Sequence, residues 1–439
     1  MNLTKLAEST DHILFKNGTV VDPEKLTQVK ADVLVRNGKL EEIGKITAPD
    51  FEGTVVDIAG LVLCPGLIDM HVHLREPGRE DEETIETGSN AAMAGGFTSV
   101  CAMPNTEPPV DHAEIVEYLV KQSKDLLVDV FPIGTVTKER AGLEITEMAD
   151  LLQAGAVAFS DDGDAVATAD VLRHAMEYAR MFDVPIIEHC EEKSLSKNGA
   201  VNEGAVSTRL GLPGIPHIAE EIIVARDIQV AEFTQARLHI AHISTAGAVE
   251  LVRKAKTRGV PVTCEVTPHH FTLNDEAVLN YDTNTKMNPP LRTAQDVEAM
   301  LAGLQDGTIE VIATDHAPHA IEEKEVEFSA APFGILGLET ALGLVLTRLV
   351  EPGVLSLPQA IAKMTKHPAE ILKLKRGTFK KGGPVSLTIF DPKIEWLVDK
   401  TKLYSKSKNT PFDHWKLKGR VFGLYNKGLW WQAAKEPLK

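Results

Sequence analysis

Apolar, β-rich segments alternate with longer amphipathic segments through most of the chain. The apolar segments have the length and composition of buried strands, and the segments between them carry apolar residues at helical spacing. Eight strands are expected, at 67–74, 98–104, 128–134, 156–160, 185–190, 238–243, 261–266 and 310–314. The expected helices include 113–124, 169–182, 218–233, 246–257 and 294–305.

This repeated alternation of strand and helix is typical of a (β/α)8 TIM barrel. An open, doubly wound sheet shows the same alternation, but it usually carries a glycine-rich nucleotide loop after its first strand. The sequence has no such loop there. We therefore expect an α/β protein in which residues 65–376 form a catalytic barrel.

The two ends of the chain have a different pattern. The N-terminal stretch contains short alternating strands separated by Asn17-Gly18 and Asn37-Gly38, dipeptides that favour tight hairpin turns. The far end is also β-rich, with a strand that ends at Asp391-Pro392. We expect residues 1–64 and 377–439 to build one small β-sandwich together.

Composition narrows the classes of partner. The chain has 439 residues, 43% of them apolar, and a formal net charge of −17, which opposes binding to nucleic acid. No run of eighteen apolar residues and no N-terminal signal-peptide pattern is present, so we expect no membrane partner. The four cysteines lie in apolar runs without zinc-knuckle spacing, which favours buried thiols in a cytoplasmic protein.

Histidine and aspartate stand where five of the eight expected strands end. His71 and His73 alternate along the first strand and therefore share a face. A single such residue is more often a hydrogen-bonded buried histidine or a turn-forming aspartate. Five strands of eight indicate a shared site, because the strand ends of a barrel meet at one mouth. The other residues at strand ends are Asp161-Asp162, His189, His242 and Asp315.

These residue types predict a metal-dependent hydrolase. Neutral imidazole and carboxylate are the ligands of Zn²⁺ and similar divalent ions, so we expect one or two ions here. A bound ion lowers the pKa of water from about 15.7 toward about 7 and polarises a carbonyl, which favours hydrolysis or its reversal. We expect Asp315 to be the general base and acid, moving a proton from water to the departing amide nitrogen. A role for Asp315 as a ligand only stays open.

Long motifs around these residues resemble those of the dihydroorotases, in the amidohydrolase superfamily. The two main motifs are PGLIDMHVHLREPG at 65–78 and ATDHAPH at 313–319. The similarity covers essentially the whole chain. It implies the reversible, zinc-dependent cyclisation of the small molecule N-carbamoyl-L-aspartate to L-dihydroorotate in pyrimidine biosynthesis. Further matching stretches are 103–106, 264–270, 286–292 and 332–334.

The resemblance also implies roles for individual residues. His71 and His73 would bind a first ion, His189 and His242 a second, with an aspartate bridging them, while Asp315 would complete the first site and carry the proton. A guanidinium fork at Arg75 suits the substrate's carboxylate, which Asn105 and His319 would also hold. The full set implied in substrate binding is His73, Arg75, Asn105, Asn288, His319, Phe333 and Gly334.

The fourth strand distinguishes subfamilies. Many relatives bridge their ions with a carboxylated lysine, but residues 156–164 contain no lysine. The chain therefore resembles the type I bacterial dihydroorotases, which use an aspartate. Asp161 and Asp162 point to opposite sides of a strand, and the family spacing from His189 favours Asp162. Because an aspartate bridge is shorter than a carboxylated lysine, the sequence leaves open whether the site binds one ion or two.

Two further segments have predicted roles. His269 and His270 belong to the family motif, and we expect them to pack behind the ligands. Residues 320–331 are acidic and follow the catalytic strand. We expect this stretch to be an irregular, mobile lid that closes over the substrate.

Two other functions stay open at this point. In a hydantoinase or allantoinase Arg75 would be superfluous, because those rings lack the carboxylate, and the missing lysine also weighs against them. An inactive scaffold that assembles with aspartate transcarbamoylase would typically lose ligands, whereas here every ligand position is filled. The sequence does not decide between a homo-oligomer and a complex with aspartate transcarbamoylase.

Overall fold

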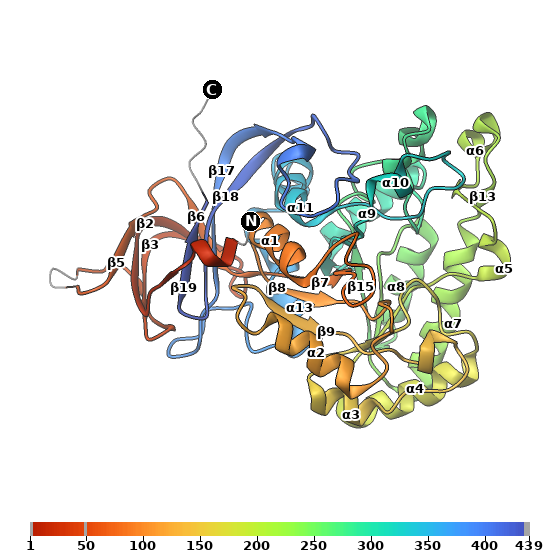
Figure 1. Cartoon of the computed structure of the whole chain (residues 1–439), viewed down its shortest axis with the longest axis horizontal. Coiled ribbons are helices and arrows are strands. Elements are labelled where there is room, and N and C mark those ends of the chain that lie inside the picture. The colour runs from red at the N-terminus through yellow and green to blue at the C-terminus, as the bar shows by residue number, and fades with distance from the viewer. Residues whose placement is uncertain (1–2, 48–50, 434–439) are drawn as a thin grey trace.

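A computed structural model describes residues 3–47 and 51–433 of the chain. An α/β barrel forms one side of the molecule and a β-rich unit built from both chain ends forms the other (Figure 1). Each barrel strand coincides with one of the eight expected strands. They are β7 (Leu67–Val72), β8 (Phe97–Ala102), β9 (Asp129–Pro132), β10 (Phe159–Ser160), β11 (Ile186–Glu188), β14 (Leu238–Ile240), β15 (Val262–Val266) and β16 (Val311–Ile312).

The eight strands close into a ring. They form two parallel groups, β7-β8-β9 and β10-β11-β14-β15-β16. Single parallel bridges, Gly134 with Phe159 and Val72 with His316, join the two groups on both sides. These single bridges explain why β10 and β16 are shorter than expected, since each has a regular ladder with one neighbour only. The predicted TIM barrel is confirmed.

Helices surround the barrel, and several begin at a threonine whose side chain accepts a backbone N–H of the first turn. Thr168 caps α4 in this way and Thr245 caps α8. The expected helices are found as α2 (Ala113–Ser123), α4 (Ala169–Phe182), α7 (Ile218–Thr234), α8 (Ala246–Thr257) and α9 (Ala294–Asp306). The others are α1 (Ile85–Gly95), α3 (Met148–Ala154), α5 (Lys193–Ser196), α6 (Ala205–Leu210), α10 (Ile321–Lys324), α11 (Leu338–Val345), α12 (Leu357–Lys363) and α13 (Lys366–Ile371).

Short elements occupy the remaining connections. Two small strands, β12 (Val201–Asn202) and β13 (Gly214–Ile215), pair in parallel beside α6. A π-helical turn, Leu346–Val350, continues α11. The 3-10 turns are Leu3–Leu6, Lys138–Arg140, Asp275–Asn280, Thr283–Thr285 and Lys400–Lys402.

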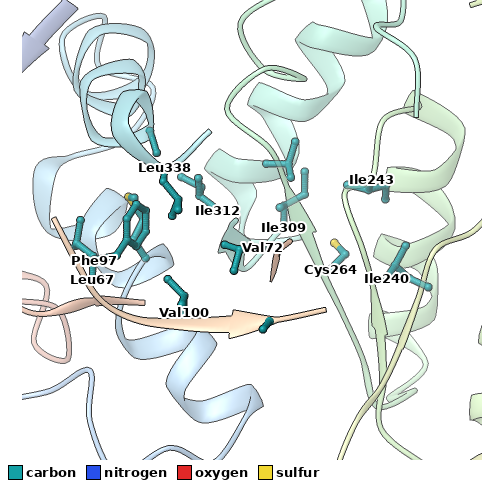
Figure 2. Packing of buried hydrophobic residues seen from close by; sticks show 14 of the residues in the cluster. Leu67, Val72, Phe97, Val100, Ile240, Ile243, Cys264, Ile309, Ile312 and Leu338 are labelled. Atoms are coloured by element: carbon teal, nitrogen blue, oxygen red, sulfur yellow. The ribbon is translucent and has the colours of Figure 1, made fainter. Parts of the chain in front are cut away.

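Two apolar clusters hold the barrel together. The larger one packs the strands against the helices, as Figure 2 shows for Leu67, Phe97, Ile240 and Leu338. The smaller one takes residues from or next to different strands of the ring and therefore fills its interior. It includes Met70, Cys101, Ile133, Ile187 and Val311. Because the interior is filled, chemistry is left to the loops at the strand ends.

The β-rich unit is one nine-stranded sheet shared by both ends of the chain. Its strands follow the order β1-β19-β18-β17-β6-β2-β3-β4, with β5 beside β2. The two ends meet where β6 pairs antiparallel with β17, which confirms the composite sandwich. The strands are β1 (Glu8–Ser9), β2 (His12–Asp22), β3 (Thr27–Arg36), β4 (Lys39–Gly44), β5 (Thr54–Asp57), β6 (Val62–Pro65), β17 (Leu387–Leu397), β18 (Lys416–Asn426) and β19 (Leu429–Gln432).

One of the two predicted hairpin turns is wrong. Asn37-Gly38, with φ of 51° and 67°, joins β3 to β4 as expected. Asn17-Gly18 lies inside β2, where the register shifts between Phe15 and Gly18 and Asn17 has a φ of 65°. The dipeptide therefore makes a β-bulge, because the strand continues beyond it. Similarly, β17 continues through Asp391-Pro392 to Leu397 instead of ending there.

The cysteines and the helices bear on the remaining general predictions. All four cysteines are buried free thiols, as expected. Among the helices of the described ranges, none has the length and apolar character required to cross a lipid bilayer.

Candidate metal centre

His71 and His73 leave the end of β7 with their rings 5.5 Å apart. The Nδ1 atom of His71 lies 2.7 Å from Oε1 of Glu265, and Nδ1 of His73 lies 2.8 Å from Oδ1 of Asn105. Both acceptors require the proton on Nδ1, which leaves the Nε2 lone pairs free. The two rings therefore present ligand atoms to the same point.

Asp162 lies at the centre of the histidines. Its Oδ1 is 3.3 Å from Nε2 of His71, 3.5 Å from Nε2 of His242 and 3.8 Å from Nδ1 of His189. Its Oδ2 is 3.5 Å from Nε2 of His73. One carboxylate thus contacts imidazoles from three different barrel strands.

Asp161 faces away from this centre. Its Oδ1 accepts the backbone N–H groups of Val136 and Thr137 at 2.9 and 3.0 Å. The alternation expected at the end of β10 is therefore present, and Asp162 is the member of the pair that lies among the histidines.

Asp315 approaches the centre from the end of β16. Its Oδ1 lies 3.0 Å from Nε2 of His73 and 3.6 Å from Nε2 of His71. Asp315 has a φ of 49° and His242 a φ of 31°, left-handed values that non-glycine residues seldom adopt. Such local strain persists where surrounding contacts fix the backbone, and it occurs preferentially at functional sites.

The donor atoms fit a divalent metal. His71 Nε2 and Asp162 Oδ1 are buried and have no hydrogen-bond partner within the described ranges, a costly state for groups of this kind. Ligand atoms form two groups that share Asp162, one with His71 and His73 and the other with His189 and His242. These groups are consistent with a binuclear site for ions that prefer imidazole and carboxylate.

Electrostatics keeps the carboxylates ionised. Burial would raise the pKa of Asp162, but the nearby imidazoles, His71 first, outweigh it and hold this pKa well below its usual range. Burial likewise opposes ionisation of Asp315, yet the nearby imidazoles of His73 and His71 lower its pKa. Ionised oxygens are what both a metal ion and a general base require.

Glu265 is a functional residue that the sequence reasoning missed. It is fully buried on β15 and accepts from Nδ1 of His71, from Nε2 of His239 at 3.2 Å and from the N–H of His242 at 3.3 Å. Burial opposes its charge, but the two histidine rings lower its pKa to about 2. The sequence feature that could have identified it is a charged residue between the apolar Cys264 and Val266 of an expected buried strand.

Arg75 and His319 lie together beside the centre. The Nη2 atom of Arg75 is 3.4 Å from Nε2 of His319, and its Nε donates to the carbonyl of Pro318 at 3.1 Å. Glu82, which the sequence reasoning also missed, contacts Nε of Arg75 at 3.0 Å and Nδ1 of His319 at 2.8 Å. It lies in the charged run REDEE, which gave no sign of burial.

The other predicted substrate residues lie around the same mouth. Asn105 orients His73 through its Oδ1. Asn288 donates from Nδ2 to Glu191 at 3.2 Å and lies 3.4 Å from Nε2 of His189. The carbonyl of Phe333 lies 2.7 Å from Nε2 of His319, which places the 333–334 backbone against that histidine. The structure therefore brings the whole predicted set to one end of the barrel.

The paired histidines after β15 differ from each other. His270 is held at both nitrogens, by Thr267 Oγ1 at 2.8 Å and by the carbonyl of Pro289 at 3.0 Å, which suits the predicted packing role. His269 is also buried, but its Nε2 has no partner in the parts of the chain that are described. Burial lowers the pKa of His269 to about 4, so its ring is neutral.

The predicted lid is irregular only in part, since no helix or strand is found at 325–331. Residues 321–324 form the short helix α10, and both Lys324 and Phe328 are buried. Arg79 on the loop after β7 contacts Glu323 at 2.6 Å. The mobility of this segment stays a prediction.

Comparisons with known proteins agree with this geometry. A family model described as Dihydro-orotase-like matches residues 60–248. The chain is 53% identical to a dihydroorotase of Citrifermentans bemidjiense over 95% of this chain and 98% of that one. It is 54% identical to a dihydroorotase of Pelotomaculum thermopropionicum over 95% and 96% of the two chains.

Solved structures share the fold. An L-hydantoinase (dihydropyrimidinase) from Arthrobacter aurescens superimposes with a TM-score of 0.86 at 26% identity, covering 97% of each chain. A dihydropyrimidinase from Brevibacillus agri gives a TM-score of 0.81 at 22% identity over 95% of this chain and 94% of that one, a likeness of fold alone.

Proposed function

The chain belongs to the dihydroorotase family, and from this premise we propose that it interconverts N-carbamoyl-L-aspartate and L-dihydroorotate at the His/Asp centre. The observation that carries the proposal is the pairing of Arg75 with His319 beside the cluster around Asp162. A partly buried guanidinium next to a hydrolytic centre suits a cyclic amide that also bears a carboxylate. The rings of hydantoin and allantoin lack that group.

In the proposed reaction, cyclisation forms the amide bond between the carbamoyl nitrogen and the side-chain carboxyl carbon of the aspartate moiety, with loss of water. Ring opening reverses this step. The remaining carboxylate is bound by Arg75, His319 and the side-chain NH2 group of Asn105, which together orient the ring. Asn288 and the backbone at Phe333-Gly334 contact the ring itself.

Asp315 moves the proton. In ring opening, its Oδ1 accepts a proton from the attacking water and then gives it to the departing ring nitrogen. Its lowered pKa keeps it ionised and ready to accept. Because His73 lies 3.0 Å from the same oxygen, the carboxylate is held in one orientation.

We propose zinc as the metal, with one or two ions per chain. His71 and His73 would hold one ion and His189 and His242 the other, with Asp162 bridging as in the type I enzymes and Asp315 completing the first site. A divalent ion there supplies Lewis acidity, which acidifies water and polarises the amide carbonyl. The absence of lysine from 156–164 supports the aspartate bridge.

Turnover of dihydroorotate, hydantoin and allantoin by the same zinc-loaded preparation tests the function. We expect turnover of dihydroorotate in both directions and little or none of the other two rings. Preferential turnover of hydantoin or allantoin would replace the proposal with another cyclic amidase. A zinc-loaded, folded protein inert towards all three would indicate a scaffold.

Three further properties belong to the proposal. Buried free thiols support a cytoplasmic location. Assembly as a homo-oligomer or with aspartate transcarbamoylase is to be tested by light scattering of the purified chain, alone and mixed with that enzyme. The domain limits of 1–64, 65–376 and 377–439 are supported by β6, which pairs with β17 and ends at Pro65, just before the first barrel strand begins at Leu67.

A further inference from the structure

Two lysines are buried beneath the segment that follows the last barrel strand. Lys286 and Lys324 are only 3% and 4% exposed, although lysine is rarely buried without a charged partner. In the described part of the chain, both ammonium groups are held by backbone carbonyl oxygens rather than by carboxylates. This arrangement calls for an explanation, because an ammonium group is costly to remove from water.

Lys286 fixes both ends of the segment 328–334. Its Nζ donates to the carbonyls of Phe328 and Ser329 at 2.9 and 3.0 Å. The same ammonium lies 4.8 Å from the ring centroid of Phe333, in a cation–π contact. The backbone carbonyl of Lys286 accepts the N–H of Gly334 at 3.0 Å.

Lys324 contacts the same segment between its two ends. Its Nζ donates to the carbonyl of Pro332 at 2.8 Å and to that of Lys286 at 3.3 Å. Burial and the neighbouring Lys286 lower the pKa of Lys324 to about 7. The backbone carbonyl of Lys286 therefore accepts both the ammonium of Lys324 and the N–H of Gly334, which ties the two lysines to the same stretch of backbone.

The backbone of segment 328–334 lies in contact with His319. The carbonyl of Phe333 lies 2.7 Å from Nε2 of His319. Gly334 has a φ of 131°, and a Cβ there would lie 3.0 Å from Nε2 of His319 and 2.7 Å from Cβ of Ala317. Only a glycine fits between them, so a small shift of segment 328–334 would displace the histidine or open a gap beside it.

We propose that Lys286 and Lys324 are positioning residues that fix segment 328–334 before substrate binds, so that Phe333 and Gly334 keep the ring of His319 beside Arg75 at the carboxylate subsite. The inference rests on the proposed function, which assigns the carboxylate to His319. It makes the C-terminal part of the expected lid a preorganised wall of the site.

Lys363 provides a matched control at the other end of the barrel. It is 5% exposed, and its ammonium donates to the backbone carbonyl of Ile309, which precedes β16. Burial lowers its pKa as well, to about 8. Lys363→Met removes a buried ammonium of the same kind without touching segment 328–334.

The first test compares steady-state kinetics of Lys286→Met, Lys324→Met and Lys363→Met, each loaded with zinc. Loss of charged hydrogen bonds to the segment should raise the KM for dihydroorotate at least about tenfold in the first two, with kcat changed less and metal content unchanged. Lys363→Met should keep the wild-type KM. Equal effects in all three variants, unchanged KM in the first two, or their loss of metal would overturn the proposal.

The second test needs neither folding of a variant nor the proposed reaction. Hydrogen–deuterium exchange of the unliganded wild-type protein should show slow exchange across 328–334, because the segment is already fixed. Exchange that is fast without ligand and slows only with dihydroorotate would overturn the proposal. If the wild-type protein does not turn over dihydroorotate but segment 328–334 exchanges slowly, the proposed function is wrong. The conclusion that the segment is fixed before ligand binds is then still supported.

Discussion

The Nδ1 atom of His71 lies 2.7 Å from Oε1 of Glu265, and both side chains are completely buried. This contact fixes which ring nitrogen carries the proton and turns Nε2 towards Asp162. Because Glu265 also bonds the N–H of His242, one carboxylate orients groups on two strands of the metal centre.

Glu265→Gln should weaken metal binding. The amide cannot hold both His71 and His239 as a carboxylate does, so affinity for zinc should fall about 10–100-fold, measured by competition with a chelator. Glu188→Gln is the matched control on β11, because Glu188 is also buried but accepts the backbone N–H of Val166 instead of bonding a histidine ring. Equal zinc affinity in Glu265→Gln and the wild type would contradict the orienting role.

Asp315→Asn should separate binding from chemistry. The amide fills the same space but cannot accept the proton, so kcat should fall at least about a hundredfold while the fold and most of the metal are kept. Discontinuous activity assays in both reaction directions give kcat, and metal analysis of the same variant shows whether the ions are retained. A near-normal kcat would restrict Asp315 to a ligand role.

Arg75→Lys should weaken binding of the substrate's carboxylate. Lysine keeps the charge but loses the planar fork, so the KM for dihydroorotate should rise about tenfold or more. Arg376→Lys serves as control, since Arg376 pairs with Asp129 at the start of β9, away from the mouth. If both variants keep the wild-type KM, Arg75 does not hold the carboxylate.

Lys363 should make stability depend on pH. Burial lowers the pKa of Lys363 from its ordinary 10.5 to about 8, so the unfolded chain binds the proton more tightly. The contribution of Lys363 to the free energy of unfolding should therefore rise as pH rises from about 8 to about 10.5. Urea unfolding of wild type and Lys363→Met at several pH values gives this difference. A difference that stays constant, or falls with pH, would contradict the buried charge.

Much of the architecture follows from local patterns. Alternation along β7 placed His71 and His73 on one face, and alternation after β10 separated Asp162 from Asp161. The bulge at Asn17-Gly18 could not be predicted in this way, because the same dipeptide suits a hairpin turn and a bulge, and pairing with β3 decides between them.

The missed residues depend on contacts between distant segments. The sequence around Glu82 is typical of a solvated loop, and only the folded chain places this residue in contact with Arg75 and His319. The acidic stretch at 320–331 predicted a mobile lid, but Lys286, which precedes it by more than thirty positions, holds the carbonyls of Phe328 and Ser329 within it. Charge patterns along a sequence do not record such partners.

Metal analysis combined with dihydroorotate turnover tests the central claim most directly. We predict that the purified protein contains one or two divalent ions per chain and converts dihydroorotate and carbamoyl aspartate into each other. Chelation should abolish both the metal and the activity, and zinc should restore both. A folded protein that binds zinc stoichiometrically and leaves dihydroorotate unchanged in either direction would contradict the account.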